Sequence, residues 1–434
     1  SSNPMPIVIV GGGLSGLVAA TTLAESGQDV VVLEKSTSIG GRAVTRGRDG
    51  YHFNLGPHAL YGGGELRRTL KRLGVDVTGG VPTGNGSFGI RRGTPHTLPV
   101  GLTSLITTSL LTLHGKMTFA RLLKNFPSID ARSWDGTQLD DWLATIGDAG
   151  VADVIRVLSR VTTFTNDPKR QSAGATIAQI QLSLRGSVLY LDGGWQTIVD
   201  GLGRVAREAG VEIRSAAPAI ALERRTARDV DAVRLADGTI VPASAVIVAA
   251  GPADVDALTR VTRFASELPP PVRVASLDIA LTSLPKPKRA VAFGVDAPLY
   301  FSVHSAIARL APEGGAVIHA SKYLAPDESA GADVEREIEA LVDMMQPGWR
   351  DRVAFKQYLP NLTVTHAELA ADRGGINGRP QVRLDAFDNV FIAGDWVGRR
   401  GQLSDGAAAS AADAAGAALQ FVRSSPARPE KAAS

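Results

Sequence analysis

The sequence predicts an α/β fold whose first domain is Rossmann-like, and three observations near the amino terminus carry this prediction. Apolar runs at Ile7–Val10 and Asp29–Leu33 are typical of buried parallel strands. Between them, Leu14–Glu25 places its apolar residues at helical spacing. The third observation is a run of glycines between the first strand and the helix, where the chain must turn sharply.

These glycines follow the pattern Gly11-x-Gly13-x-x-Gly16. The first permits a tight turn, the second lets the backbone approach a diphosphate, and the third lets the helix pack closely on the strand. The amino terminus of the helix then offers free N–H groups and a partial positive charge. Glu34 ends the second strand and can accept hydrogen bonds from a ribose diol. The unit therefore predicts a dinucleotide site, with a purely structural turn as the alternative.

A second match to the glycine pattern, Gly84 to Gly89, shows how little the pattern means alone. No apolar strand precedes it, and Ile90–Pro99 is typical of strands and turns rather than of a helix. We therefore expect a loop that leads into a hairpin here, and no second nucleotide fold that would bind a nicotinamide.

Composition narrows the classes of function. Lysine and arginine total 46 against 43 acidic residues, without a basic run, so we expect no nucleic-acid partner. The chain has no cysteine, which excludes disulfides and thiolate chemistry. It also shows no secretory signal, and we expect a cytoplasmic location. The seven histidines lack metal-ligand spacing, so we expect no metal.

Several further segments match the motifs of one family, in the right order along the chain. They are Ile39–Arg42 (IGGR), Phe53–Leu60 (FNLGPHAL), Gly210–Leu222, Ala245–Asp254 and Asn389–Ala415. With them, the sequence resembles the FAD-binding superfamily of amine oxidases, protoporphyrinogen oxidases and phytoene-type desaturases, most closely its bacterial phytoene-desaturase-like branch.

The resemblance implies a Rossmann-like FAD-binding domain of the GR2 type with an inserted α+β substrate domain. The FAD-binding domain would be discontinuous, and the two insertions would build the substrate domain. The expected boundaries are 1–85, 190–255 and 380–434 for the former, and 86–189 and 256–379 for the latter.

The resemblance also implies which residues hold FAD. The glycine turn and the residues after the second strand would hold the diphosphate and ribose, and Phe53–Leu60 would run beside the flavin ring. A later strand would contact the adenine through its backbone, and the Ala-Gly-Asp turn near the carboxyl terminus would hold the ribityl chain. The expected contacts are Gly11, Gly13, Leu14, Ser15, Gly16, Glu34, Lys35, Gly41, Arg42, Gly56, Pro57, His58, Ala59, Ala219, Ala250, Gly394, Asp395, Gln402 and Leu403.

The carboxyl-terminal motif supports this assignment on physical grounds. Val390–Ala393 predicts a buried strand, Gly394 lets the chain turn against a ligand, and Asp395 supplies a carboxylate for a polyol hydroxyl. Asp405–Leu419 predicts an alanine-rich helix that can lie close to a cofactor, with free N–H groups that stabilise negative charge on a reduced flavin. An ordinary helix packed on a sheet, with Asp395 in a turn, is the alternative.

The candidates for catalysis are His58 and Tyr61. His58 lies in the segment expected beside the flavin and could act as a base or polar anchor, or could simply satisfy a turn. Some amine oxidases keep a lysine that reaches the flavin through water, but the residues around Lys322 differ, so that role is not assigned. Amine oxidases often place aromatic residues at the flavin, whereas this chain has Gln402 beside Leu403 there. That difference favours oxidation of carbon–carbon bonds.

We therefore expect an FAD-dependent oxidase or dehydrogenase that removes a hydride from a largely apolar organic substrate to flavin N5. O₂ or a quinone would accept the electrons. The alternatives are an amine oxidase that forms an imine and hydrogen peroxide, a redox-neutral flavin isomerase, and a prenyl-binding relative without catalysis. Leu98–Asp130 predicts one or two helices that cover an apolar pocket or pack in the core, and peripheral membrane contact is the less favoured interpretation.

Overall fold

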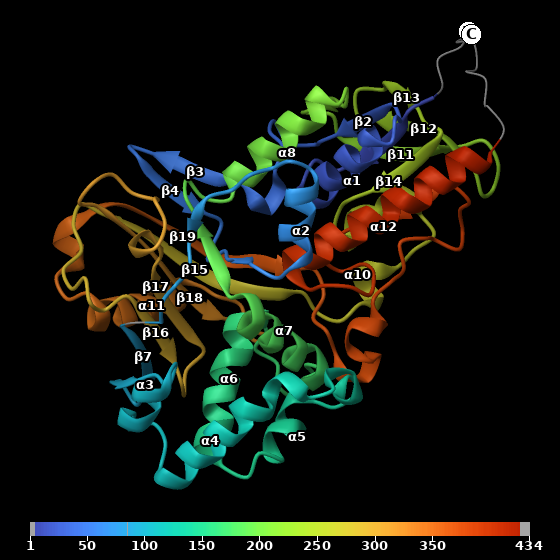
Figure 1. The fold of residues 1–434 in the computed structure, drawn as a ribbon. Coiled ribbons are helices and arrows are strands. Elements are labelled where there is room, and N and C mark those ends of the chain that lie inside the picture. The colour runs from blue at the N-terminus through green and yellow to red at the C-terminus, as the bar shows by residue number, and fades with distance from the viewer. Residues whose placement is uncertain (1–4, 85, 426–434) are drawn as a thin grey trace.

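The computed structural model describes residues 5–84 and 86–425. These residues form two regions that lie side by side (Figure 1). One is built on a parallel sheet near both chain ends, and the other on a larger, mainly antiparallel sheet with a layer of helices beyond it.

The parallel sheet has five strands in the order β10-β2-β1-β14-β20, and every neighbouring pair is parallel. Its strands are β1 (Ile7–Val10), β2 (Val30–Leu33), β10 (Glu212–Arg214), β14 (Ala245–Val248) and β20 (Val390–Ile392). Most of these strands are buried throughout, because both faces of the sheet are covered.

Alternate residues of β1 pack into two different cores. Ile7 and Ile9 contact a helical layer, whereas Val8 and Val10 face a small antiparallel sheet. The helical layer consists of α1 (Leu14–Glu25), α8 (Gln196–Glu208) and α12 (Leu403–Ser424), and the small sheet of β11 (Ala219–Arg224), β12 (Val230–Leu235) and β13 (Ile240–Pro242).

The predicted helix bounds are confirmed for α1 and are too short for α12. Sequence analysis placed the last helix at residues 405–419, whereas α12 runs from Leu403 to Ser424. Its extra turn packs Phe421 and Val422 against the core below the parallel sheet. These residues extend the helix beyond the alanine-rich stretch that the composition marks.

The second sheet has seven strands in the order β19-β15-β18-β17-β16-β7-β8, with helix α11 (Ala332–Met345) packed on it. The strands are β7 (Ser87–Arg91), β8 (Thr94–Thr97), β15 (Val272–Leu281), β16 (Val291–Gly294), β17 (Leu299–Val303), β18 (Ala316–Tyr323) and β19 (Val353–Thr365). β7 and β8 pair as an antiparallel hairpin, which confirms the structure predicted after the second glycine match. Asn85 of that match lies outside the described residues.

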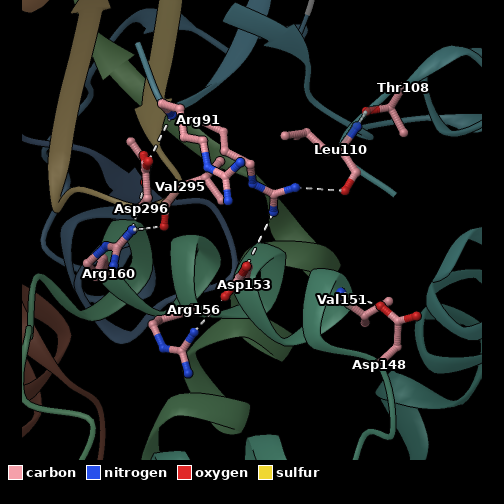
Figure 2. Close-up of polar contacts among 12 residues, drawn as sticks. Arg91, Thr108, Leu110, Asp148, Val151, Asp153, Arg156, Arg160, Val295 and Asp296 are labelled. Atoms are coloured by element: carbon pink, nitrogen blue, oxygen red, sulfur yellow. Dashed lines mark hydrogen bonds and ion pairs between the residues drawn. The ribbon is translucent and has the colours of Figure 1, made fainter. Parts of the chain in front are cut away.

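A layer of five helices lies at the end of the molecule opposite α1 (Figure 1). It contains α3 (Leu102–Thr107), α4 (Leu113–Asn125), α5 (Leu139–Ala144), α6 (Ala149–Thr163) and α7 (Ala173–Gly186). The prediction of one or two helices within Leu98–Asp130 is therefore confirmed, with two, α3 and α4, present. Their buried residues, such as Phe119, pack in the core of this layer. Asp148 begins α6, and its carboxylate accepts a hydrogen bond from Val151 N at 3.0 Å (Figure 2).

Short elements connect these parts. They are β3 (Thr45–Arg48), β4 (Tyr51–Asn54), β5 (Leu60–Tyr61), α2 (Glu65–Arg72), β6 (Gly79–Gly80), β9 (Val188–Leu191), α9 (Pro252–Thr259) and α10 (Phe264–Glu267). All strands of the parallel sheet fall within 1–85, 190–255 and 380–434, and all strands of the seven-stranded sheet fall within 86–189 and 256–379. We therefore propose the same division into a nucleotide domain and a substrate domain.

Candidate functional site

A cavity of about 690 Å³ begins at the carboxyl ends of β1, β2, β14 and β20 and extends to the seven-stranded sheet. β1 lies between β2, which follows it in the chain through α1, and β14, which the chain reaches much later, so the strand order changes direction at β1. Crevices at such a point are where open parallel sheets bind ligands. The position alone indicates a binding site shared by the two regions.

Each of the three glycines of the first motif has the structural role that its position in the motif predicts. Gly11 has φ +111°, and a Cβ there would lie 2.3 Å from the carbonyl oxygen of Ala249. A Cβ on Gly16 would lie 1.8 Å from the carbonyl oxygen of Gly11, so this glycine permits close packing of α1. A Cβ on Gly13 would meet no atom within 4 Å. Gly13 lines the cavity, and its bare backbone leaves room for a diphosphate at the start of α1.

Glu34 lies beside this turn with its carboxylate largely buried. Oε2 accepts a hydrogen bond from Gly12 N and Oε1 from Ser36 N, each at 2.7 Å. Each carboxylate oxygen has a second lone pair, so both can still accept from a ribose hydroxyl. Beyond it, Lys35 pairs with Asp254 at 3.1 Å at the mouth of the cavity. These residues fit the sugar and diphosphate of a dinucleotide.

Arg42 and Asp395 meet in the middle of the cavity. Arg42 Nη2 lies 2.7 Å from Asp395 Oδ2, and Nη1 donates to the carbonyl of Val364 at 2.6 Å. Burial alone would raise the pKa of Asp395, but Arg42 and His366 hold this pKa below its usual value. Asp395 is therefore ionised at neutral pH.

His58 lines the part of the cavity next to the seven-stranded sheet. Its Nδ1 lies 3.0 Å from the carbonyl oxygen of Gly56, which can only accept, so Nδ1 carries the proton. Nε2 is then the basic nitrogen of this side chain. Burial lowers the pKa of His58, which keeps the imidazole neutral at pH 7. The ring lies edge-on to Trp195, with centroids 5.0 Å apart.

Most of the predicted cofactor residues line this cavity. They are Gly11, Gly13, Leu14, Ser15, Glu34, Lys35, Gly41, Arg42, Pro57, His58, Ala59, Ala219, Ala250, Gly394, Asp395 and Leu403. Gly16 and Gly56 lie behind the lining instead. A Cβ on Gly56 would lie 2.7 Å from Leu362 Cδ2, so Gly56 lets this loop approach the second sheet.

Two of the predicted residues, Tyr61 and Gln402, are not among the residues that line the cavity. The Tyr61 hydroxyl donates to the carbonyl of Thr162 at 3.1 Å, and burial raises its pKa. Gln402 Nε2 donates to the carbonyl of Ala175 at 2.7 Å. We therefore assign no catalytic role to Tyr61. Lys322 also lies outside the lining and pairs with Glu328 and Glu337.

The apolar end of the cavity was missed by sequence reasoning. It is formed by side chains from the end of α6, from β15 and from β19, namely Phe164, Val274, Leu362 and Val364. Phe164 follows α6 with φ +59°, a left-handed conformation that is rare for a bulky residue. No motif marks these positions, because ordinary strand and helix residues reach the cavity only through tertiary packing.

The charges of the cavity are unevenly distributed. Its acidic residues are Glu34, Asp254 and Asp395, and all three belong to the nucleotide domain. Among the described residues, those that the seven-stranded sheet contributes to the lining are uncharged. The end that would receive a substrate thus offers an apolar surface and one neutral imidazole.

Comparison with known proteins agrees with this geometry. A family model described as flavin containing amine oxidoreductase matches residues 14–419. The chain belongs to this family. The family description implies a flavin cofactor, and the cavity described above fits FAD. The predicted superfamily, fold class and cofactor are confirmed.

Individual relatives support the fold and leave the substrate open. An L-amino-acid oxidase of Sistrurus catenatus edwardsii is 42% identical over 78 residues, which cover 18% of this chain and 15% of that protein. An oxidoreductase from Methanosarcina mazei has a TM-score of 0.75 at 20% identity, covering 94% of this chain and 99% of that one. Cyclohexylamine oxidase from Brevibacterium oxydans has a TM-score of 0.69 at 16% identity, covering 97% and 100%. At such identities the two structures share the fold alone.

Proposed function

We propose that this amine oxidoreductase family member removes a hydride from a neutral, largely apolar organic substrate. The observation that supports this proposal is the apolar lining around His58, to which the seven-stranded sheet contributes no charged residue among those described. A cationic ammonium group would lose its hydration there without gaining a carboxylate partner. A neutral substrate meets no such cost.

We further propose that successive parts of FAD contact successive groups of the predicted residues along the cavity. Gly13 and the start of α1 would hold the diphosphate, Glu34 the ribose, and the Arg42–Asp395 pair the chain between diphosphate and ring. When bound, FAD supplies the ring that takes up a hydride. Phe164, Val274 and Leu362 would exclude water and orient the reacting carbon, and His58 Nε2 would accept a proton from the substrate.

O₂ or a quinone remains the proposed electron acceptor. The second glycine pattern leads into the β7–β8 hairpin and not into a strand–helix crossover, so it offers no nicotinamide site. Removal of a hydride and a proton from adjacent carbon atoms would leave a carbon–carbon double bond. The two electrons would then pass from the cofactor to the acceptor.

Oxidation of an apolar amine to an imine and hydrogen peroxide is the second candidate. The family description and the likeness in fold to cyclohexylamine oxidase favour it. In this cavity such an amine would have to bind as the neutral base, because the residues that the seven-stranded sheet contributes to the lining include no carboxylate. Asp278 of β15, whose charge acts on His58, is already paired with His319. The rate of oxidation would therefore rise with pH toward the pKa of the amine.

The proposal is tested by anaerobic bleaching of the flavin. The holoenzyme is mixed without O₂ with polyenes, porphyrinogens, cyclic amines and polyamines, and the flavin absorbance is followed. We expect bleaching by a neutral apolar compound and recovery when air is readmitted. Bleaching by polyamines alone, which carry several charges, would overturn the proposal. Bleaching by cyclic amines with a rate that rises with pH would favour the second candidate.

A further inference from the structure

Large apolar side chains are exposed on the two helices at the start of the helical layer. Leu102 on α3 and Leu113 on α4 are each 76% exposed, and Ile106 and Met117 are also exposed. Within each helix the two residues are four positions apart, so each pair lies on one helical face. Single exposed leucines are common, but pairs on adjacent helices form a patch that calls for a partner.

These helices are held in place, so the patch does not arise from a loose segment. Lys116 Nζ donates to the carbonyl of Ile106 at 2.6 Å and ties α4 to α3. Figure 2 shows the anchor of the segment between them, where Arg91 Nη1 donates to the carbonyl of Leu110 at 3.1 Å. The same guanidinium pairs with Asp153 of α6 at 3.3 Å. The patch is therefore preformed on the helical layer.

The charge of this segment has one sign. From Leu98 to Ile129 the charged residues are Lys116, Arg121 and Lys124, and the exposed Asp130 that follows caps the next turn through Arg132 N. Arg121 and Lys124 are exposed on α4, on the side that carries Leu113 and Met117. The carboxylate of Asp148 lies over Gly115 but is engaged as the cap of α6. The helices thus present apolar residues together with uncompensated positive charge.

We propose that this α3–α4 face, formed by Leu102, Ile106, Leu113 and Met117 with Arg121 and Lys124, docks on an anionic lipid surface. The apolar side chains would enter the boundary between headgroups and acyl chains, while the cations pair with lipid phosphates. A second copy of the chain fits this face less well, because a two-fold contact would bring the same cations together.

The position of the α3–α4 face relates docking on a lipid surface to the cavity. Within the described residues no helix has the length and apolar character of a membrane span, so the contact would be at the surface. α4 packs on α6, and the residue after α6, Phe164, lines the cavity. The α3–α4 face is therefore connected through α4 and α6 to one residue of the cavity lining. The docking itself does not depend on which substrate is oxidised.

Flotation with vesicles tests this proposal on the holoenzyme. The vesicles are phosphatidylcholine alone or with about 30% phosphatidylglycerol, at low and high salt. We expect the wild-type protein to float with the anionic vesicles and to be released by salt. Leu102→Ser/Leu113→Ser and Arg121→Glu/Lys124→Glu should each weaken binding at least about tenfold. The matched control Ile240→Ser/Val261→Ser removes exposed apolar residues that lie outside the α3–α4 face and should float like wild type.

Each other outcome counts against the proposal. Failure of the wild-type protein to float with anionic vesicles would overturn it, as would equal flotation of all variants. Sedimentation of the same proteins without lipid shows whether the face joins two copies. Self-association that is lost in Leu102→Ser/Leu113→Ser, without vesicle binding, would assign the face to a second copy. Retained flavin absorbance in every variant shows that the fold is intact.

Discussion

Arg42 and Asp395 form an ion pair that joins the two ends of the chain at the centre of the cavity, with Arg42 Nη2 2.7 Å from Asp395 Oδ2. Arg42 follows the glycine pair after β2, and Asp395 follows β20. Two cofactor motifs that are remote in sequence thus complete one another. Arg42 also holds the backbone of β19 through Val364, so the pair links both domains.

Replacement of Arg42 by Met should weaken FAD retention and lower stability. The change leaves the buried Asp395 without its partner, which costs about 3–5 kcal/mol for a fully buried pair. Because Arg42 is 39% exposed, we expect a smaller loss of about 1–2 kcal/mol. Urea denaturation of the FAD-free protein measures it. Arg42→Met/Asp395→Asn should recover most of this stability, and equal losses in the single and double variants would argue against the pair.

The two glycines that flank the start of α1 should respond differently to alanine. In Gly16→Ala the new Cβ meets the carbonyl oxygen of Gly11, so we expect a loss of stability of about 2–4 kcal/mol or failure to fold. In Gly13→Ala the new Cβ points into open space, and the FAD-free protein should be as stable as wild type. Thermal denaturation of the FAD-free variants separates these cases. Equal destabilisation of both would contradict the packing described here.

The decrease of kcat/KM at acid pH should follow the protonation of His58. Burial lowers its pKa from 6.5, so Nε2 stays unprotonated and basic from pH 6.5 upward. We expect kcat/KM to be level there and to fall once the pH drops below the lowered pKa. His58→Gln should reduce kcat/KM by about 10²–10³ and remove that decrease. His52→Gln serves as the control, and an unchanged decrease at acid pH in His58→Gln would rule out this proton acceptor.

Asp405 should lower the stability of the folded protein above about pH 6. Burial raises its pKa from 3.8 to about 6, so the folded protein binds a proton that the unfolded chain has lost between these values. The contribution of Asp405 to the free energy of unfolding therefore falls as pH rises from about 4 to 6. Asp405→Asn keeps an oxygen for Leu66 N and should stabilise the protein by about 1–3 kcal/mol at pH 8, with little effect at pH 4. The exposed Asp413→Asn on the same helix is the control, and a gain at both pH values would exclude the charge as the cause.

The sequence predicted which residues of the parallel-sheet region line the cavity, because their determinants are local. Gly11, Gly13 and Glu34 act through a turn and the strand that follows, and periodicity shows both. The substrate end was not predictable in this way. Phe164 and Leu362 reach the cavity from distant elements, and neither belongs to a motif.

Closeness in sequence to other site residues did not predict the side-chain directions of Tyr61 and Gln402. Tyr61 was grouped with His58, but the chain enters β5 between them, and the Tyr61 hydroxyl is directed to α6 through Thr162. Gln402 sits directly before α12, where its side chain reaches back to α7 instead of entering the cavity. Such directions depend on how helices pack, which no single segment encodes.

Titration of FAD-stripped protein with FAD, followed by calorimetry, tests the central claim most directly. The claim is that FAD lies in the cavity with its diphosphate at Gly13. We expect one FAD per wild-type chain, binding at least about 100-fold weaker in Gly13→Ala, and wild-type affinity in Gly416→Ala, where a new Cβ likewise meets no atom within 4 Å but lies on the far part of α12. Wild-type affinity in Gly13→Ala, or no binding of FAD to the wild-type chain, would contradict the account.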